Sequence, residues 1–314
     1  MPIVTRPATP GPGSPHWIQR EPLAGDATSR RYSRLRRADG GTAILAEYPA
    51  EARPAMGRDL EVLHWFAQIG LRVPEVFGDD LDEGWLVLED LGAEDAEERL
   101  RNTPVAERGD LLRAAIEPLS VFAGIDVETY PGWNQPLDAV RMRWELSGFE
   151  LWYVVHHLAG RPSGKLDQWL DDLAAEVATH PVRICHRDYH INNLFFLPSG
   201  EVVMIDVQDV LVGPDTYDAV SLLSERAVAE LVAAGERERL RRAWAESTGA
   251  GAGWEERWSQ VRLQRALKVI GTFARLHACG KPGYRFWMRS LAADLIAEAD
   301  QLQLPGELVD LLLD

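Results

Sequence analysis

The stretch that decides the fold is ICHRDYHINNLFFLPSGEVVMIDVQD, residues 184–209. Two apolar runs, NLFFL and EVVMID, flank a Pro-Ser-Gly turn, and this pattern predicts a β-hairpin. Asn193 begins the first strand and Asp206 ends the second, so antiparallel pairing brings both side chains to the same end of the ribbon. Asp188 lies in the loop just before the hairpin. Packing alone does not call for three polar groups at these positions.

The chemistry of these three groups suits phosphoryl transfer. Two carboxylates and an amide oxygen are hard ligands of the kind that Mg²⁺ prefers. The spacing HxDxxxxN, followed by an apolar strand that ends in Asp, is typical of phosphotransferases, in which Asp188 accepts a proton from the acceptor hydroxyl and Asn193 and Asp206 hold the metal. The alternative is a capped loop with a turn Asn and no chemistry. The order and spacing of all three together favour the catalytic interpretation.

The composition excludes several classes of protein. Hydrophobic residues make up 46% and charged residues 26% of the 314 residues, as in soluble globular enzymes. A net charge of −16 argues against nucleic acid as a partner, since a phosphate-binding face usually gives a basic excess. No apolar run is long enough to cross a membrane, and the N-terminus has no export-signal pattern. With only two cysteines and no export signal, the chain is expected to be a cytoplasmic protein. The sequence does not fix the oligomeric state, and a monomer is expected.

The order of elements along the chain predicts an α+β fold. Strand patterns at 16–23, 30–37, 42–48, 72–78 and 84–91, with a helical apolar stripe at 54–70, predict a five-stranded antiparallel lobe over residues 16–91. Residues 92–314 are predicted to form a larger helical lobe for catalysis and substrate binding. The first fifteen residues hold five prolines and are expected to form a flexible tail.

Several segments carry a family resemblance: GDATSRRYSRL (25–35), VPEVFGDDLDEGWLVLEDLG (73–92), Trp-Glu-Leu (144–146) and residues 185–223, which contain HRDYHINN. They resemble the aminoglycoside phosphotransferase and choline kinase group, relatives of protein kinases, and within it the bacterial anomeric N-acetylmuramate/N-acetylglucosamine kinases of cell-wall recycling. The resemblance implies a two-lobed kinase-like fold, ATP and Mg²⁺ as cofactors, and Asp188 as the base. It also implies that Glu89 to Leu91 form a hinge that binds adenine through the backbone.

The sequence departs from the kinase pattern in its phosphate-binding residues. Kinases carry a lysine on the third strand, but this chain has only three lysines, all at or after Lys165, and no glycine-rich loop with three glycines. We expect Ser29, Arg30 or Arg31 to bind the phosphates, because the guanidinium fork suits phosphate oxygens. The two arginines alternate on a strand, so only one can face the nucleotide. The alternative is an inactive kinase-like module.

The sugar acceptor is expected to contact the helix predicted over residues 138–160. Arg143, Glu145 and Trp152 offer the polar and flat apolar surfaces that a sugar needs, and His190 of the catalytic loop is a further candidate. For Trp152 and His190 the alternative is an ordinary packing role. Asp218 is predicted to anchor the catalytic loop from the next helix.

These observations predict an ATP-dependent kinase that phosphorylates the anomeric hydroxyl of N-acetylglucosamine, N-acetylmuramate or a related amino sugar. An aminoglycoside, choline or other small-alcohol kinase is the alternative within the same fold. A catalytically silent nucleotide-binding module is the alternative from another class.

Overall fold

The computed structural model describes residues 11–23 and 30–314. The chain separates into two compact units: unit 1 comprises Met1–Pro118 and Ile191–Asp209, and unit 2 comprises Leu119–His190 and Val210–Asp314. The predicted hairpin therefore belongs to unit 1, whereas the loop that carries Asp188 belongs to unit 2. The division into a tail and two lobes at residues 15 and 91 stays a prediction, and residues 1–10 of that tail lie outside the described residues.

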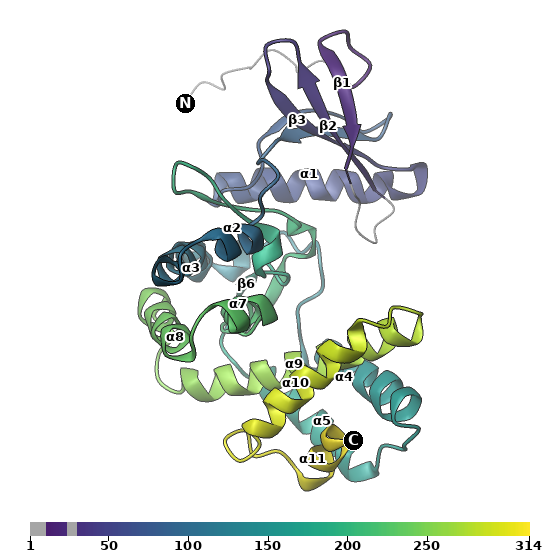
Figure 1. Cartoon of the computed structure of the whole chain (residues 1–314), viewed down its shortest axis with the longest axis vertical. Coiled ribbons are helices and arrows are strands. Elements are labelled where there is room, and N and C mark those ends of the chain that lie inside the picture. The colour runs from purple at the N-terminus through teal and green to yellow at the C-terminus, as the bar shows by residue number, and fades with distance from the viewer. Residues whose placement is uncertain (1–10, 24–29) are drawn as a thin grey trace. The chain divides into compact units, whose positions relative to one another are not determined.

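Unit 1 combines a sheet, helices and a hairpin (Figure 1). Its elements are β1 (Trp17–Pro22), β2 (Arg31–Arg37), β3 (Thr42–Glu47), η1 (Ala50–Ala52), α1 (Arg53–Gln68), β4 (Val76–Asp80), β5 (Trp85–Glu89), α2 (Ala96–Asn102), η2 (Val105–Glu107), the first part of α3 (Arg108–Gly124), η5 (Ile191–Asn193), β7 (Leu194–Phe196), β8 (Val202–Met204) and η6 (Val207–Asp209).

The five-stranded antiparallel sheet predicted from the sequence is confirmed, with strand order β1-β2-β3-β5-β4. Alternation along the strands gives it two apolar faces. One face buries Leu35, Ala43, Leu45 and Val87. The other packs Ala46, Tyr48 and Leu86 against Met56 of α1. The sheet and α1 thus form the framework on which the nucleotide-site candidates of unit 1 lie.

The fourth strand lies later in the chain than predicted. The pattern at 72–78 led us to expect a strand there, but β4 spans Val76–Asp80. Pro74 has no N–H to donate to a strand ladder. The carbonyl of Arg72 instead accepts a hydrogen bond from the N–H of Met204, at 2.9 Å. Arg72 is therefore tied to the hairpin, whereas the carbonyl of Glu75 accepts a hydrogen bond from the N–H of Glu89 in β5, at 2.8 Å.

Unit 2 is mainly helical. Its elements are the last part of α3, η3 (Val127–Thr129), α4 (Ala139–Gly148), η4 (Phe149–His157), α5 (Gly164–Val177), β6 (Val182–Cys185), β9 (Leu211–Pro214), α6 (Tyr217–Leu223), α7 (Arg226–Leu231), α8 (Ala234–Thr248), α9 (Trp254–Ala278), α10 (Tyr284–Ala297) and α11 (Gly306–Leu313). The long helix α9 contacts α4, η4 and α10, which lie beside it in Figure 1. The two-stranded antiparallel sheet of β6 and β9 was not predicted, because four-residue strands give little periodicity.

The helix predicted over 138–160 is not uniform. It is α-helical as α4 and continues from Phe149 to His157 as the wider π-helix η4. A Cβ atom added at Gly271 of α9 would lie 2.5 Å from the carbonyl carbon of Gly148 and from the nitrogen of Phe149. The two backbones therefore meet closely at the point where the helix widens.

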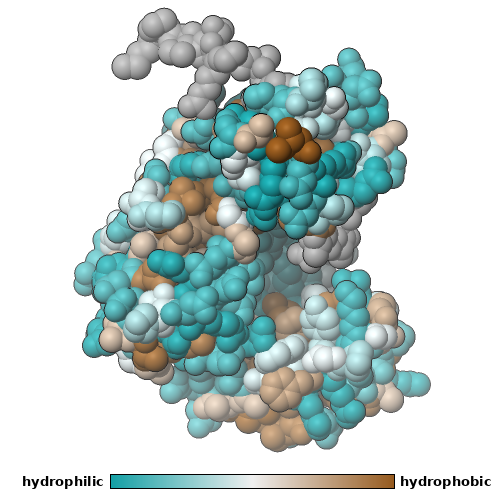
Figure 2. Space-filling model, turned by 45° about the horizontal axis from the view of Figure 1, so that its top comes forward, coloured by the Kyte–Doolittle hydropathy of each residue, from teal (hydrophilic) through white to brown (hydrophobic). Residues whose placement is uncertain are grey.

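The surface drawn in Figure 2 is mostly hydrophilic, with hydrophobic residues in small groups. Within residues 11–23 and 30–314, no helix combines the length and the apolar character needed to span a bilayer.

Candidate active site

The loop that carries Asp188 is anchored by Asp218 at the start of α6, as the sequence predicted. The carboxylate of Asp218 accepts hydrogen bonds from the N–H of His186 at 2.7 Å and from the N–H of Arg187 at 3.0 Å. Arg187 has a φ of 75°, an unfavourable left-handed conformation for a residue with a Cβ. The two bonds hold the backbone of Arg187 in this conformation and so fix where the chain presents Asp188.

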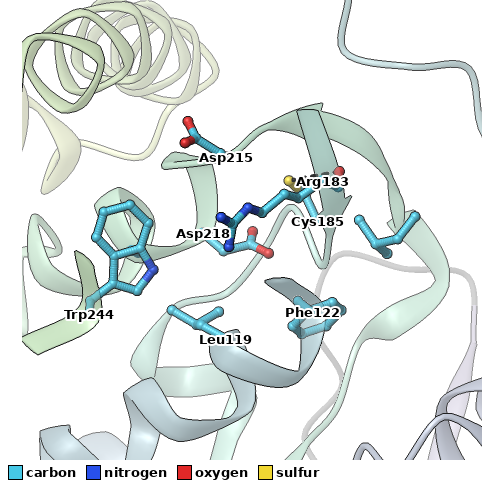
Figure 3. A pocket seen from close by; sticks show the side chains of 9 residues that line it. Leu119, Phe122, Arg183, Cys185, Asp215, Asp218 and Trp244 are labelled. Carbon is cyan, nitrogen blue, oxygen red and sulfur yellow. Dashed lines mark hydrogen bonds between the residues drawn. The ribbon is translucent and has the colours of Figure 1, made fainter. Parts of the chain in front are cut away.

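The anchor lies beside a small cavity of unit 2 (Figure 3). The cavity is lined by Leu119, Phe122, Arg183, Ile184, Cys185, Asp215, Asp218, Ala219 and Trp244. Because the side chain of Asp218 is fully buried there, its pKa is raised to about 7. Arg183 donates to the carbonyl of Thr248 at 2.9 Å, which ties β6 to the end of α8. The burial of Asp218 beside this cavity suits a structural support of the loop.

Glu145, a predicted sugar-binding residue, lies in a buried network around the catalytic loop. Its carboxylate accepts a hydrogen bond from Arg187 at 3.2 Å, pairs with Lys268 of α9 at 3.0 Å and accepts a hydrogen bond from Gln264 at 3.2 Å. Burial alone would raise the pKa of Glu145, but Lys268, Arg187 and Gln264 outweigh burial and lower it. The carboxylate is therefore ionised at neutral pH.

The two predicted metal ligands lie at one end of the hairpin in unit 1. Strands β7 and β8 pair antiparallel, and the N–H of Ile205 donates to the carbonyl of Asn193 at 2.9 Å. Asp206 follows directly, with a φ of 61° and a side chain that is 40% exposed. Its Oδ1 atom accepts a hydrogen bond from Gln208 at 2.7 Å.

This donor set fits a magnesium ion. One amide oxygen and one exposed carboxylate leave most of the coordination sphere to waters and phosphate oxygens, as Mg²⁺ prefers. The described residues contain no group of three or more His, Cys, Asp or Glu side chains arranged to hold a metal. Two protein ligands, one of them an asparagine, are consistent with that result.

The candidates for phosphate binding differ in their exposure. The side chain of Arg30 is only 13% exposed and donates to Asp59 of α1 at 3.1 Å. Its second amino group lies 3.7 Å from Oδ1 of Asp206. Arg31, the next residue, is exposed. Ser29, the third candidate, lies outside the described residues.

The predicted hinge is braced by two arginines of unit 1. Glu89 accepts hydrogen bonds from Arg72 at 2.7 Å and from the N–H of Glu75 at 3.1 Å, while Leu91 is half-buried. Arg34 of β2 donates twice to Asp90, at 2.7 and 3.1 Å. The side chains of Glu89 and Asp90 therefore hold the segment, and the binding of adenine by its backbone groups stays a prediction.

The remaining acceptor candidates lie in unit 2. Arg143 pairs with Glu150, Asp167 and Asp171 and is 23% exposed. Trp152 stacks on His156 with ring centroids 4.9 Å apart and is half-buried, as is His190. Their contact with a sugar stays a prediction.

Sequence reasoning missed two residues that contact predicted site residues in the structure. Asp59 is buried and pairs with Arg30, and Lys268 pairs with Glu145. Each had a signal in the sequence. Asp59 lies three residues after Met56 and four before Leu63, on the apolar stripe of its helix, where a charge is costly. Lys268 is one of only three lysines.

Comparisons with known proteins agree with this geometry. A model of the phosphotransferase enzyme family matches residues 19–262. An N-acetylmuramate/N-acetylglucosamine kinase of Pseudomonas aeruginosa is 32% identical over 277 residues, covering 84% of this chain and 78% of that protein. A kinase of the same name from Neisseria meningitidis serogroup B is 30% identical over 283 residues, covering 83% of this chain and 80% of that protein.

The crystal structure of an aminoglycoside-3'-phosphotransferase of type VIII is similar to this chain with a TM-score of 0.56 and 21% identity, over 79% of this chain and 93% of that one. This likeness confirms the predicted fold class, with its five-stranded antiparallel sheet and helical remainder. The family model spans most of the chain and includes both the Asp188 loop and the hairpin. The chain therefore belongs to the phosphotransferase enzyme family.

Proposed function

We propose that this phosphotransferase is a cytoplasmic kinase that uses ATP and Mg²⁺ to phosphorylate the anomeric hydroxyl of N-acetylglucosamine, N-acetylmuramate or a close amino sugar. The products are the sugar 1-phosphate and ADP. The observation that supports this chemistry is the backbone hydrogen bond between Ile205 and Asn193, which puts Asn193 and the neighbouring residue Asp206 at one end of the hairpin. The named relatives support the choice of sugar.

Each candidate residue has a role in this reaction. Asp188 accepts the proton of the attacking hydroxyl, on a loop whose backbone is fixed by Asp218. Asn193 and Asp206 would hold the divalent ion, which would supply positive charge to the phosphates. Arg30 contacts the phosphates. Phosphoryl transfer depends mainly on positioning and charge, so few groups are sufficient.

Two arguments support the anomeric position and an amino sugar. The anomeric hydroxyl is the most acidic hydroxyl of a sugar and asks least of Asp188 as a proton acceptor. This matters in a site without the usual lysine. A site built to hydrogen-bond the N-acetyl group would discriminate against glucose, because each buried polar group left unpaired costs about 1–3 kcal/mol.

A panel of sugars and alcohols screened for ADP release tests the proposal. We expect the greatest turnover with N-acetylglucosamine or N-acetylmuramate, and a phosphorus signal coupled to the anomeric proton in NMR spectra of the product. Coupling to the C6 protons would refute the regiochemistry. Turnover with aminoglycosides or choline alone would refute the sugar, and ATP binding without any turnover would identify a silent module.

A further inference from the structure

We propose that Asp59 is a positioning residue that, together with Tyr48, holds the guanidinium of Arg30 in place as the phosphate-binding cation of a site that has no lysine. This inference rests on the proposed function, because it assumes that unit 1 binds the phosphates of a nucleotide. It concerns residues of α1 and of the segment after β3 that are not part of the catalytic loop or the hairpin.

The geometry gives the two amino groups of Arg30 different surroundings. Nη1 donates to Oδ2 of Asp59 at 3.1 Å, and the hydroxyl of Tyr48 donates to the same oxygen at 3.0 Å. Nη2 lies 3.7 Å from Oδ1 of Asp206, the proposed metal ligand. The side chain of Asp59 is 9% exposed and that of Asp206 is 40% exposed. Nη1 is thus fixed inside unit 1, and Nη2 lies near the more exposed end of the hairpin.

The buried carboxylate is a costly way to stabilise a fold. Its second oxygen, Oδ1, is buried without a hydrogen-bond partner among the described residues. Burial also raises the pKa of Asp59, against the effect of Arg30 and Tyr48. A buried, incompletely satisfied charge usually gives little or no net stability. A role in orienting Arg30 explains why a carboxylate is present on the apolar stripe of α1.

The planar guanidinium is suited to this division of work. It can be held by one edge and still offer N–H groups to a phosphate oxygen from the other, whereas a lysine ammonium is a single point charge. Unit 1 contains no lysine, since all three lie in unit 2. If Asp206 held a magnesium ion, the ion would supply positive charge to the phosphates, and Nη2 of Arg30, 3.7 Å from Oδ1 of Asp206, would offer a second cation at the same end of the hairpin.

The test is a double-mutant cycle on the full chain with Asp59→Asn, Arg30→Ala and the double variant. The dissociation constant for ATP with Mg²⁺ is measured by calorimetry, and kcat and both KM values are measured where turnover exists. We expect Asp59→Asn to raise the dissociation constant for ATP about 10- to 100-fold, the scale of a misplaced binding group. The KM for the sugar should stay unchanged. In the Arg30→Ala background, Asp59→Asn should add nothing, since Asp59 acts through Arg30.

Conservative variants extend the cycle. Tyr48→Phe, which removes one hydrogen bond to Asp59, should weaken ATP binding about two- to tenfold. Asp59→Glu keeps the charge and should retain more activity than Asp59→Asn. As a control, Glu21→Gln removes a carboxylate from an exposed arginine pair of the same sheet, with Arg36 at 3.7 Å, and should change nothing.

Two outcomes would overturn the inference: unchanged ATP affinity in both Asp59→Asn and Tyr48→Phe, or additive losses in the double variant, which indicate a general structural role. If Asp59→Asn fails to fold, the ATP affinities of Tyr48→Phe and Asp59→Glu distinguish a positioning role from a general structural one. A wild-type protein that binds ATP without transferring phosphate refutes the proposed function, yet the cycle on ATP affinity still tests the inference.

Discussion

The buried carboxylate of Glu145 accepts a hydrogen bond from the guanidinium of Arg187, the residue directly before Asp188, at 3.2 Å. Lys268 pairs with the same carboxylate, so Glu145 joins α4 and α9 to the catalytic loop. A helix pair distant in sequence therefore helps to fix the position of the proposed base.

The first prediction concerns this ion pair. Glu145→Ala leaves Arg187 and Lys268 without their buried partner and should lower the free energy of unfolding by about 3–5 kcal/mol, with a loss in kcat. The control is Arg239→Ala in α8, whose side chain is 73% exposed and pairs with Glu236 one turn away, and whose loss should cost less than about 1 kcal/mol. Denaturant unfolding measures both. A sugar-binding role for Glu145 requires the opposite result, a raised KM for the sugar with stability unchanged.

The second prediction concerns the general base. Asp188→Asn should keep the fold and lower kcat by ~10²–10⁴, the usual scale for the loss of a general base. Circular dichroism and ATP binding should match those of the wild type, because Asn has nearly the same shape. A folded variant with near wild-type turnover would remove Asp188 from this role.

The third prediction concerns the metal. Asp206→Asn should raise the Mg²⁺ concentration needed for half-maximal activity at least ~10-fold, because one charged ligand becomes neutral. Asn193→Ala should act in the same direction. Ser199→Ala, at the turn of the same hairpin, is the control, since the Ser199 hydroxyl donates to the exposed carboxylate of Glu201 in that turn, at 2.9 Å. Equal Mg²⁺ dependence in all three variants would place the metal elsewhere.

The fourth prediction concerns pH. Burial raises the pKa of Asp218 from 3.8 to about 7, so the folded protein holds this proton more tightly than the unfolded chain does. The stabilising contribution of this group is therefore fully present below its unfolded pKa and is lost as the pH rises through about 7. The side chain introduced by Asp218→Asn cannot titrate. The free energy of unfolding of this variant should therefore decline less than that of the wild type as the pH rises from 3.8 through about 7. Parallel stability curves for the two proteins would contradict the raised pKa.

The fifth prediction concerns the π-helix. Gly271→Ala adds a Cβ atom 2.5 Å from the backbone of Gly148 and should destabilise the protein by about 1–3 kcal/mol, the usual cost of overpacking. Gly57→Ala, inside α1 with nothing within 4 Å of the new Cβ, should instead stabilise it by roughly 0.5–1 kcal/mol. Thermal unfolding distinguishes the two. Equal effects would mean that η4 can move away from α9.

The parts of this molecule that were predictable depend on local signals. The hairpin follows from two apolar runs around a tight turn, and the anchoring of the loop by Asp218 follows from its place in the next helix. The five strands of the main sheet were found for the same reason. The displaced start of β4 depends on a long-range bond from Met204 to Arg72, which local pattern cannot contain.

The less predictable parts depend on packing between distant segments. The change from α- to π-helix at Phe149 coincides with the approach of Gly271, more than a hundred residues later. Arg30 pairs with Asp59, whereas Arg31 is exposed. This difference arises because α1, which carries Asp59, packs on the sheet. Alternation on a strand predicted that only one of the two arginines could face the nucleotide, but it did not say which.

The absence of lysine from unit 1 affects how this enzyme can be labelled and modified. Acyl-phosphate derivatives of ATP, which tag kinases by acylating a lysine amine near the phosphates, find no side-chain amine in this unit. Acetylation, which removes a lysine charge, likewise has no lysine target there. Dicarbonyl reagents selective for guanidinium groups are the matching probes for unit 1, and protection of Arg30 from them by ATP would map the phosphate site without any substitution.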